Sequence, residues 1–296
     1  MDERVWLAER FEEHRVHLRA VAYRMLGSLS EADDAVQEAW LRLSRADTGG
    51  VENLAGWLTT VVSRVCLNLL RARASRREDS LEVRMPDPII GREGGDNPEQ
   101  AALLADAVGL ALLVVLDTLT PAERLAFVLH DLFALPFEEI APLLERSPAA
   151  TRQLASRARR RVRGTAPVPD PDRARQREVV DAFLAATRDG NFDALVAMLD
   201  PDVVLRADGG EARARQTVVI RGATAVAGQA ALAARLAPFA RPALINGTAG
   251  IVAVAGGRAL AVMGFIVAGG KIVAIDILYD PDRLVGFDLS ALDGTP

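Results

Sequence analysis

The sequence has a single cysteine, Cys66, and only three histidines, His14, His17 and His130. One cysteine excludes an intramolecular disulfide, and the scattered histidines do not have the spacing of a metal site. We therefore expect no metal and no cofactor. A reducing cytoplasm is the simplest setting for such a chain.

Long apolar runs are also missing. The run from Gly247 to Ile275 is interrupted by two glycine pairs, so it is too short to span a membrane. Residues 1–13 mix acids with arginines and lack the apolar core of a secretion signal. We expect no membrane partner, and a chain of 296 residues has room for roughly two domains.

The chain has little net charge, −5, but its arginines are concentrated locally. The stretches 64–77 and 146–163 contain arginines and no acid. Basic patches on an acidic chain predict nucleic-acid contact with low affinity for DNA by the chain alone. Another partner must then supply the remaining binding energy.

The second basic stretch is typical of a DNA-reading helix. Ser147 is a good N-cap before a proline, and Gly164 can end the helix. The amphipathic segment 137–144 precedes it across a short turn, which is helix-turn-helix spacing. Glu145 stands where glycine is usual, and Pro142 predicts a short or kinked first helix. A solvated arginine-rich helix has the same composition, but the preceding segment favours DNA binding.

Two earlier stretches predict helices with distinct outer faces. A helix opened by a capping box at Ser30 to Asp33 places Val36, Trp40 and Leu43 inward; its acidic outer face is either solvated or a partner-binding surface. The helix from 54 to 73 carries a polar row that suits a groove or a DNA strand. The outer face of the first helix is Asp34, Gln37, Glu38 and Leu41. The polar row of the second is Thr60, Arg64, Asn68 and Arg71.

Proline and glycine divide the chain further, because residues 78–100 and 165–171 read as linkers. Beyond them, helices come first and strands follow, which predicts an α+β cone with a curved antiparallel sheet. The expected strands are 203–205, 218–220, 243–245, 251–254, 259–267 and 272–278.

Three motifs, Ser30–Trp40, Gly56–Val62 and Ser147–Arg159, resemble bacterial sigma factors of the extracytoplasmic-function (ECF) group. The chain is most similar to the subgroup with a fused SnoaL-like, NTF2-like C-terminal domain. The resemblance implies a multidomain fold of two all-α modules, sigma region 2 and a helix-turn-helix sigma region 4, followed by an α+β cone. The expected divisions are 1–77 (region 2), 78–100 (linker), 101–164 (region 4), 165–171 (linker) and 172–296 (SnoaL-like regulatory domain).

The resemblance also implies partners and roles. Asp34, Gln37, Glu38 and Leu41 would dock core RNA polymerase. Thr60, Arg64, Asn68 and Arg71 would meet the minus-ten element of promoter DNA. Thr151, Arg152, Gln153, Ser156, Arg157 and Arg160 would meet the minus-35 element. The two elements are about 17 base pairs apart, roughly 58 Å, and the linker 78–100 reaches roughly 75 Å when extended.

The subgroup's contact motifs are matched in part. Residues 84–88 keep the two prolines and an acid of the motif Trp-Leu-Pro-Glu-Pro but lack its aromatic residue. Residues 208–211 keep only the start of the motif Asp-Gly-Gly-Gly-Lys. Residues 280–284 differ from the motif Asn-Pro-Asp-Lys-Leu by conservative substitutions. The resemblance implies intramolecular contacts between the C-terminal domain and the sigma modules; a small-molecule ligand of the cone stays an open question. The expected contact residues are Pro86, Asp87, Pro88, Asp208, Asp280, Asp282 and Arg283.

We therefore expect a sigma factor that directs core RNA polymerase to promoters, is modulated by its own C-terminal domain, and catalyses nothing. One alternative is a helix-turn-helix regulator that binds an operator unaided as a dimer. Another is a sigma module fused to an NTF2-like enzyme. Its acid and base would have to come from groups such as Asp208, Asp276 and Tyr279, because every histidine and the cysteine precede this domain.

Overall fold

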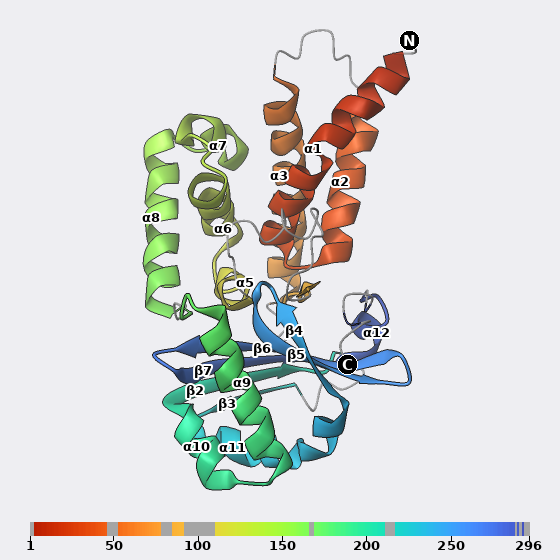
Figure 1. The fold of residues 1–296 in the computed structure, drawn as a ribbon. Coiled ribbons are helices and arrows are strands. Elements are labelled where there is room, and N and C mark those ends of the chain that lie inside the picture. Colours follow the sequence, from red (N-terminus) through yellow and green to blue (C-terminus); the bar gives the residue numbers. More distant parts are fainter. Residues whose placement is uncertain are drawn as a thin grey trace. The chain divides into compact units, whose positions relative to one another are not determined.

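The computed structural model describes residues 3–45, 53–77, 85–91, 110–165, 169–210, 217–287, 289 and 292. They fall into two compact units (Figure 1). The first unit holds the helices before residue 166, and the second holds the linker segment 85–91 and the chain from residue 169. Helix α5 (Leu110–Leu116) is divided between the units. Among the described helices, none is both long and apolar enough to cross a membrane.

The first unit begins with three mutually packed helices, α1 (Glu3–Leu26), α2 (Leu29–Leu43) and α3 (Leu54–Arg77). Gly27 ends α1, because its φ is 70°, in the left-handed region, and its N–H donates to the Tyr23 carbonyl at 2.8 Å. The expected capping box at Ser30 is wrong. Helix α2 starts at Leu29 with Ser28 as its N-cap, and the Ser30 hydroxyl is hydrogen-bonded to the Ser28 hydroxyl.

The helix-turn-helix follows in the same unit, with α6 (Pro121–Phe127), the π-helical turn η1 (Val128–Leu132), α7 (Phe137–Leu144) and α8 (Pro148–Thr165). Thr120 and Glu123 form a capping box at the start of α6. Helix α7 is short and contains Pro142, in agreement with the sequence. Glu145 ends it in the left-handed region at φ 53°, a conformation that costs a non-glycine residue about 1–2 kcal/mol.

The two helical modules share a buried contact. Arg124 of α6 is only 2% exposed; its Nε and Nη2 each donate to the Arg24 carbonyl at 3.2 Å, and it pairs with Asp117.

Cys66 of α3 is fully buried, and burial raises the pKa of its thiol to about 12. The thiol is therefore protonated and inert at neutral pH.

The second unit is built on a seven-stranded sheet in the order β1-β4-β5-β6-β7-β2-β3. Its strands are β1 (Ile90–Gly91), β2 (Leu199–Asp208), β3 (Val218–Arg221), β4 (Ala240–Ile245), β5 (Thr248–Ala255), β6 (Arg258–Ala268) and β7 (Lys271–Leu278). All six expected strands are present, and β1, from the linker, was not expected. The expected antiparallel pairing holds for the other neighbouring strands, but β2 pairs with β7 in parallel, so the sheet is mixed.

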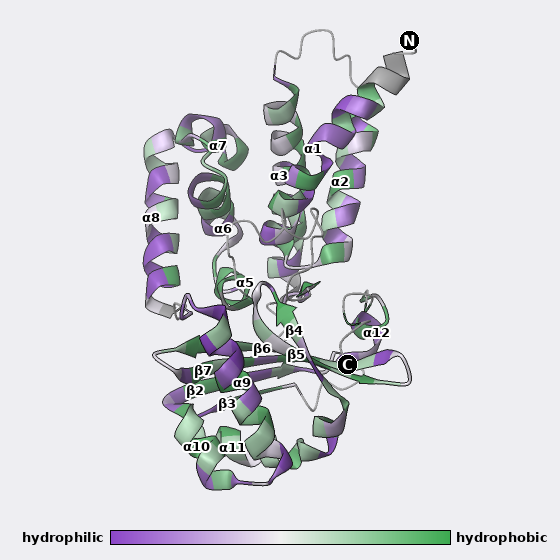
Figure 2. Cartoon of the chain, in the orientation of Figure 1, coloured by the Kyte–Doolittle hydropathy of each residue, from purple (hydrophilic) through white to green (hydrophobic). Residues whose placement is uncertain are grey.

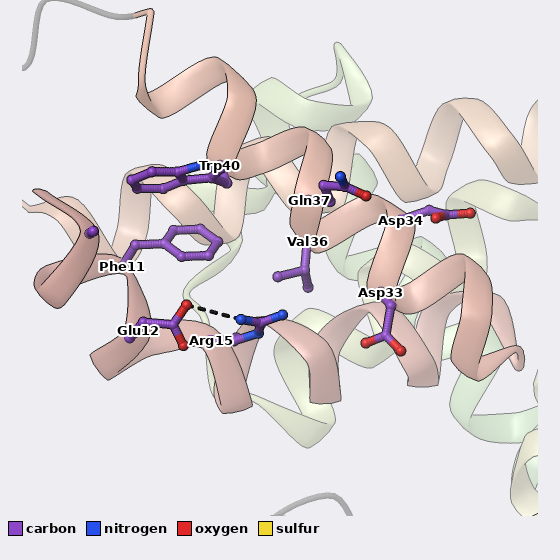
Figure 3. A pocket seen from close by; sticks show the side chains of 9 residues that line it. Phe11, Glu12, Arg15, Asp33, Asp34, Val36, Gln37 and Trp40 are labelled. Atoms are coloured by element: carbon purple, nitrogen blue, oxygen red, sulfur yellow. Dashed lines mark hydrogen bonds and ion pairs between the residues drawn. The ribbon is translucent and has the colours of Figure 1, made fainter. Parts of the chain in front are cut away.

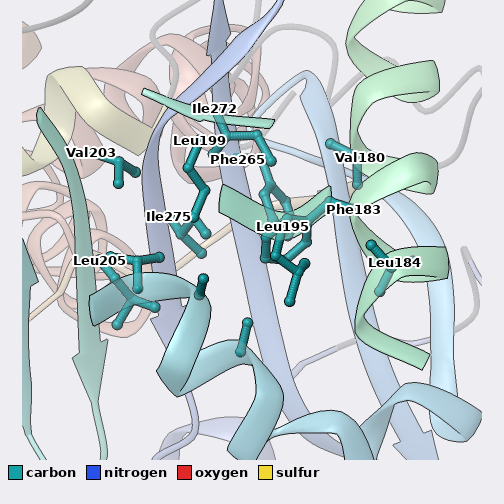
Figure 4. Close-up of a cluster of buried hydrophobic side chains, with 14 of the residues drawn as sticks. Val180, Phe183, Leu184, Leu195, Leu199, Val203, Leu205, Phe265, Ile272 and Ile275 are labelled. Atoms are coloured by element: carbon teal, nitrogen blue, oxygen red, sulfur yellow. The ribbon is translucent and has the colours of Figure 1, made fainter. Parts of the chain in front are cut away.

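The helices of this unit are α9 (Arg173–Arg188), α10 (Phe192–Met198), α11 (Ala223–Leu232), the 3₁₀ turn η3 (Ala234–Phe239) and α12 (Pro281–Leu284). Helices α9, α10 and α11 contact strands of the sheet and enclose an apolar core with them (Figures 1 and 4). Phe183 of α9 and Phe265 of β6 meet edge to face in this core, with ring centroids 5.7 Å apart. The α+β cone expected from the sequence is confirmed.

Candidate functional site

Helix α8 exposes the polar face that the sequence predicted. Figure 2 shows hydrophilic residues along this helix. Leu154, Ala155 and Ala158 are buried on its other side. Ser147 acts as the expected cap, because its hydroxyl accepts the Ala150 N–H at 3.2 Å. The exposed polar residues are Arg152, Gln153, Ser156, Arg157, Arg160, Arg161 and Arg163.

Thr151 lies elsewhere than the sequence led us to expect. It is 0% exposed, and its hydroxyl donates to the Ser147 carbonyl at 3.1 Å. A buried hydroxyl that already has an acceptor inside the helix has no route to a base edge. We therefore leave Thr151 out of the DNA-reading face.

Three arginines of α8 are held by acids of the preceding helices. Arg157 Nε lies 3.1 Å from Glu123 Oε1, and Arg161 Nη1 lies 3.2 Å from Glu123 Oε2. Arg159 Nε lies 2.9 Å from an Asp131 carboxylate oxygen. Burial opposes ionisation of Glu123, but hydrogen bonds from Thr120 and the two arginines outweigh it, so the pKa of Glu123 is lowered. Burial dominates at Asp131, whose pKa is raised despite Arg159.

Arg152 is positioned by a stack of rings. Its guanidinium carbon lies 5.2 Å from the centre of the Phe137 ring, and Phe137 stacks on His130 with centroids 3.8 Å apart. The His130 Nδ1 is in turn 2.9 Å from the Leu135 carbonyl oxygen. A guanidinium held over an aromatic face loses less side-chain freedom when it binds a partner.

The outer face of α2 borders a groove of about 440 Å³ (Figure 3). Phe11 of α1 and Trp40 of α2 pack at 5.2 Å between ring centroids, and Asp34 and Gln37 line the same groove. Of the four residues expected to face outward, Asp34, Gln37 and Leu41 are exposed, and Glu38 is half-buried beside Arg42 at 2.8 Å. Val36 and Leu43 are buried, as the helical spacing predicted, whereas Trp40 is only half-buried because it lines the groove.

The polar row of α3 also lies on the surface. Arg64, Asn68 and Arg71 are exposed and Thr60 is half-buried. Thr59 and Ser63 are buried with the apolar side of the helix. The row therefore presents two cations and an amide, a set that suits phosphates and unpaired base edges.

The linker segment 85–91 is bound to the sheet of the second unit at two places. At the first, Arg283 of α12 donates from Nε to Asp87 at 3.0 Å, from Nη1 to Asp208 at 2.9 Å and from Nη2 to the Met85 carbonyl at 2.7 Å. The Met85 N–H donates to the same Asp208 carboxylate at 2.8 Å. The structure thus brings together Asp87, Asp208 and Arg283, while Pro86 and Pro88 are buried beside them.

At the second place, Asn246 binds the linker backbone. Its side-chain oxygen accepts the Ile89 N–H at 3.0 Å, and its own N–H donates to the Ile89 carbonyl at 2.9 Å. Ile90 and Gly91 then pair with β4 as strand β1. Asn246 was not among the contact residues predicted from the sequence. Its only local signal was the Asn-Gly pair between two strands, which is typical of a hairpin turn.

The other two residues expected to make contacts, Asp280 and Asp282, lie at the start of α12. The Asp280 carboxylate caps α12 by accepting the Asp282 N–H at 3.0 Å. A Cβ at position 210 would overlap the Asp280 carboxylate, and Gly210 has φ 69°, so glycine is required there. Asp282 contributes its backbone N–H, and its side chain is exposed. Glu211 lies outside the described residues.

Neither carboxylate named for a catalytic pair faces the interior of the cone. Leu205, Ala207 and Ile275 belong to the core under the helices. Alternate residues of a strand point to opposite faces, so Asp208 and Asp276 lie on the opposite face of the sheet. Asp276 is 1% exposed and pairs with Arg206 at 2.7 Å. Burial raises the pKa of Asp276, and Arg206 offsets part of that effect.

Within the described residues, His, Cys, Asp and Glu side chains nowhere gather in a group of three that could hold a metal ion. The chemistry on the surface is that of arginine-rich and acidic faces on packed helices. Such faces bind polyanions and proteins by charge complementarity.

Comparison with known proteins agrees with this arrangement. Residues 10–76 match Sigma-70 region 2 and residues 109–162 match Sigma-70, region 4. The chain is 39% identical over 300 residues to the ECF RNA polymerase sigma factor SigJ of Mycobacterium tuberculosis, covering 97% of this chain and 96% of the relative. It is 35% identical over 283 residues to the probable ECF RNA polymerase sigma factor SigI of the same species, covering 92% of each.

The crystal structure of the M. tuberculosis SigJ superposes with a TM-score of 0.77 at 35% identity, over 95% of this chain and 99% of that one. The match includes the C-terminal α+β domain as well as the two helical modules. The expected fold class and family are confirmed, and the chain belongs to the ECF RNA polymerase sigma factors, which direct RNA polymerase to promoters.

Proposed function

We propose that three surfaces of the first unit divide the work of promoter recognition, and that the second unit regulates them through the linker. The functional divisions follow those inferred from the sequence, 1–77, 101–164 and 172–296. Core RNA polymerase and promoter DNA are the partners, and the cytoplasm is the compartment. The single observation that supports this best is the separation of an acidic face on α2 from arginine-bearing faces on α3 and α8.

The α2 face, Asp34, Gln37, Glu38 and Leu41, is the proposed contact with core polymerase. It joins the exposed Asp34 and the half-buried Glu38 to an exposed leucine beside a groove. A protein partner with basic and apolar side chains suits this mixture, whereas the phosphates of DNA would be repelled by it.

Reversing the charge of this face should weaken polymerase binding. We expect Asp34→Arg with Glu38→Arg to reduce affinity for core polymerase by about tenfold or more, since like charges then oppose each other at the contact. The measurement is titration of labelled full-length protein with purified core polymerase. Asp193→Arg, at an exposed position of α10, is the control and should bind normally; equal loss in both variants would contradict the assignment.

The α3 row, Thr60, Arg64, Asn68 and Arg71, is the proposed contact with the minus-ten element. The α8 face, Arg152, Gln153, Ser156 and Arg160, is the proposed reader of the minus-35 element. In the major groove, arginine can form a bidentate hydrogen bond with guanine and glutamine can form one with adenine. Each side chain can therefore discriminate between base pairs.

Arg152 should carry a large share of upstream specificity because it is already oriented by Phe137. We expect Arg152→Ala to cost about 1–3 kcal/mol at one upstream base pair and to leave downstream preference unchanged. The measurement is transcription by the holoenzyme on two promoter libraries, each randomised in one element. Arg188→Ala, on α9 in the second unit, is the control; a parallel loss of both preferences would show that α8 and α3 are assigned wrongly.

The C-terminal domain is proposed to regulate and not to catalyse. Its candidate carboxylates are engaged in ion pairs with Arg283 and Arg206. Its linker contacts give it a direct means of control, because a linker that is held at Met85 to Gly91 restricts the separation of the two helical modules. The roughly 58 Å between promoter elements requires most of the linker's extended length.

The experiment that tests the whole proposal is transcription in vitro with purified core polymerase on randomised promoter DNA, followed by sequencing of transcript starts. The expected result is a two-element promoter that is used only when this protein is added. Tight, sequence-specific duplex binding by the protein alone, with no polymerase-dependent transcription, would favour an operator-binding regulator. Substrate turnover by the C-terminal domain would favour a fused enzyme.

A further inference from the structure

Glu123 does more in the structure than cap a helix. Its carboxylate accepts the Thr120 N–H at 3.2 Å, as a capping box requires, and at the same time binds Arg157 and Arg161 of the recognition helix α8. The Glu123 side chain is 6% exposed, whereas the two arginines are 49% and 47% exposed. A buried acid therefore holds two arginines that otherwise reach solvent.

The two arginines flank the face proposed to read DNA. At 3.6 residues per turn, Arg157 and Arg161 lie one turn apart along one edge of that face. Asp131 holds Arg159 at the opposite edge, at 2.9 Å. The acids of α6 and η1 thus hold the edges of the face and leave Arg152, Gln153, Ser156, Arg160 and Arg163 between them.

Arginines at the edge of a reading face are the residues that meet phosphates. Phosphate contacts add affinity without adding sequence information. Each phosphate that is neutralised steepens the slope of the logarithm of the binding constant against the logarithm of the salt concentration by about 0.9. Two arginines withheld from DNA therefore lower non-specific affinity while leaving base reading intact.

We propose that Glu123 is a specificity-determining residue: it keeps Arg157 and Arg161 off DNA phosphates and so raises the ratio of specific to non-specific binding. Arg157 is then a restrained residue and not a direct reader of the minus-35 element. This inference rests on the proposed function of α8 as the upstream reader. It explains how a helix with six arginines avoids becoming a general polyanion binder.

The test uses Glu123→Gln in the full-length chain. Glutamine is itself a capping-box residue, so the helix start is retained while the charge that holds the arginines is lost. The first probe is a short DNA duplex of random sequence, with binding measured between about 50 and 200 mM salt. We expect the salt slope to steepen by about 1.8, since two phosphate contacts are gained, so that affinity falls roughly tenfold more than for the unaltered protein over this range.

Three further variants separate this effect from a general change of charge and from misfolding. Glu139→Gln removes one exposed acid from α7 of the same module, and should leave the slope unchanged. Glu123→Gln combined with Arg157→Gln and Arg161→Gln should return the slope to that of the unaltered protein. Arg157→Gln with Arg161→Gln alone keeps Glu123 and should also leave the slope unchanged; a decrease of about 1.8 would show that these arginines already bind phosphates, and would overturn the proposal.

The second readout is the holoenzyme on randomised promoter DNA. Glu123→Gln should increase transcript starts at unrelated sequences severalfold relative to starts at the selected promoter. An unchanged ratio together with an unchanged slope would overturn the proposal. A holoenzyme without any promoter-specific transcription would instead refute the sigma function of α8, and the salt slope on random duplex would still report whether Glu123 holds the arginines.

Discussion

Replacing Arg283 by alanine should release the linker from the C-terminal sheet. Arg283 connects Asp87 of the linker to Asp208 of β2 and also binds the Met85 carbonyl. The side chains of Arg283, Asp87 and Asp208 are 17%, 13% and 5% exposed. Removing one partner from a largely buried ion pair costs about 3–5 kcal/mol, because the remaining charge stays desolvated. Here two carboxylates would lose their cation at once.

The expected result is a loss of linker binding, not global unfolding. The apolar core enclosed by α9, α10 and α11 does not include the three charged residues. We therefore expect hydrogen exchange at the Met85 and Ile89 amides to accelerate by about a hundredfold or more, as a loss of about 3 kcal/mol in local stability implies. Transcript output should change severalfold in the same variant if the bound linker regulates the sigma modules.

Asp282→Ala is the matched control. Asp282 is the neighbour of Arg283 and is also charged, but its side chain is exposed and only its N–H is used, at 3.0 Å from Asp280. This variant should keep the linker amides protected and transcription unchanged. If Arg283→Ala speeds amide exchange but leaves transcription unchanged, then the contact between the linker and the sheet has no regulatory role. That result would count against regulation through the linker.

Features that depend on neighbouring residues in the chain could be predicted from the sequence. The capping box of Thr120 and Glu123, the glycine that ends α1, and the cap at Ser147 need only local spacing. The outward faces of α2, α3 and α8 follow from helical periodicity, since burial of one stripe fixes what lies opposite. Six strands could be recognised for the same reason, because alternation and glycine pairs mark them.

Features that depend on distant residues could not be predicted this way. Glu123, whose capping role depends only on local spacing, also pairs with Arg157 and Arg161, 34 and 38 positions away. Strand β1 has only two residues, too few for a pattern to appear, and it forms because Asn246 and β4 supply hydrogen-bond partners. The parallel pairing of β2 with β7 joins strands far apart in the chain. The start of α2 was misplaced because Ser28 and Ser30 are both of a residue type that favours the N-cap, and Ser28 holds that position without a side-chain hydrogen bond to the helix.

The second large effect is expected at Arg206. Arg206 of β2 and Asp276 of β7 are directly opposite each other in the sheet and 2.7 Å apart. Asp276 is fully buried, so Arg206→Met would leave a carboxylate without its cation in an apolar environment. We expect a loss of about 3–5 kcal/mol in the free energy of unfolding at neutral pH. The measurement is urea denaturation, with unfolding monitored by far-ultraviolet circular dichroism.

The stability lost in Arg206→Met should become smaller as the pH falls. Burial already raises the pKa of Asp276 in the folded protein, with Arg206 acting against it. Without Arg206 the folded-state pKa rises further above the unfolded value. A raised carboxyl pKa gives stability that is present below the unfolded pKa and is lost as pH rises through the folded pKa. The difference between Arg206→Met and the unaltered protein should therefore be largest at neutral pH and shrink as pH falls.

The double variant Arg206→Met with Asp276→Asn separates charge from packing. It removes the buried charge together with its cation, and replacing both members of a buried pair is often close to neutral in stability. We expect it to recover most of the stability lost by Arg206→Met and to lose the pH dependence of the difference. If the double variant is as unstable as the single one at every pH, then Arg206 stabilises the sheet through its side-chain packing between β2 and β7, and the charge of Asp276 has no part in the loss.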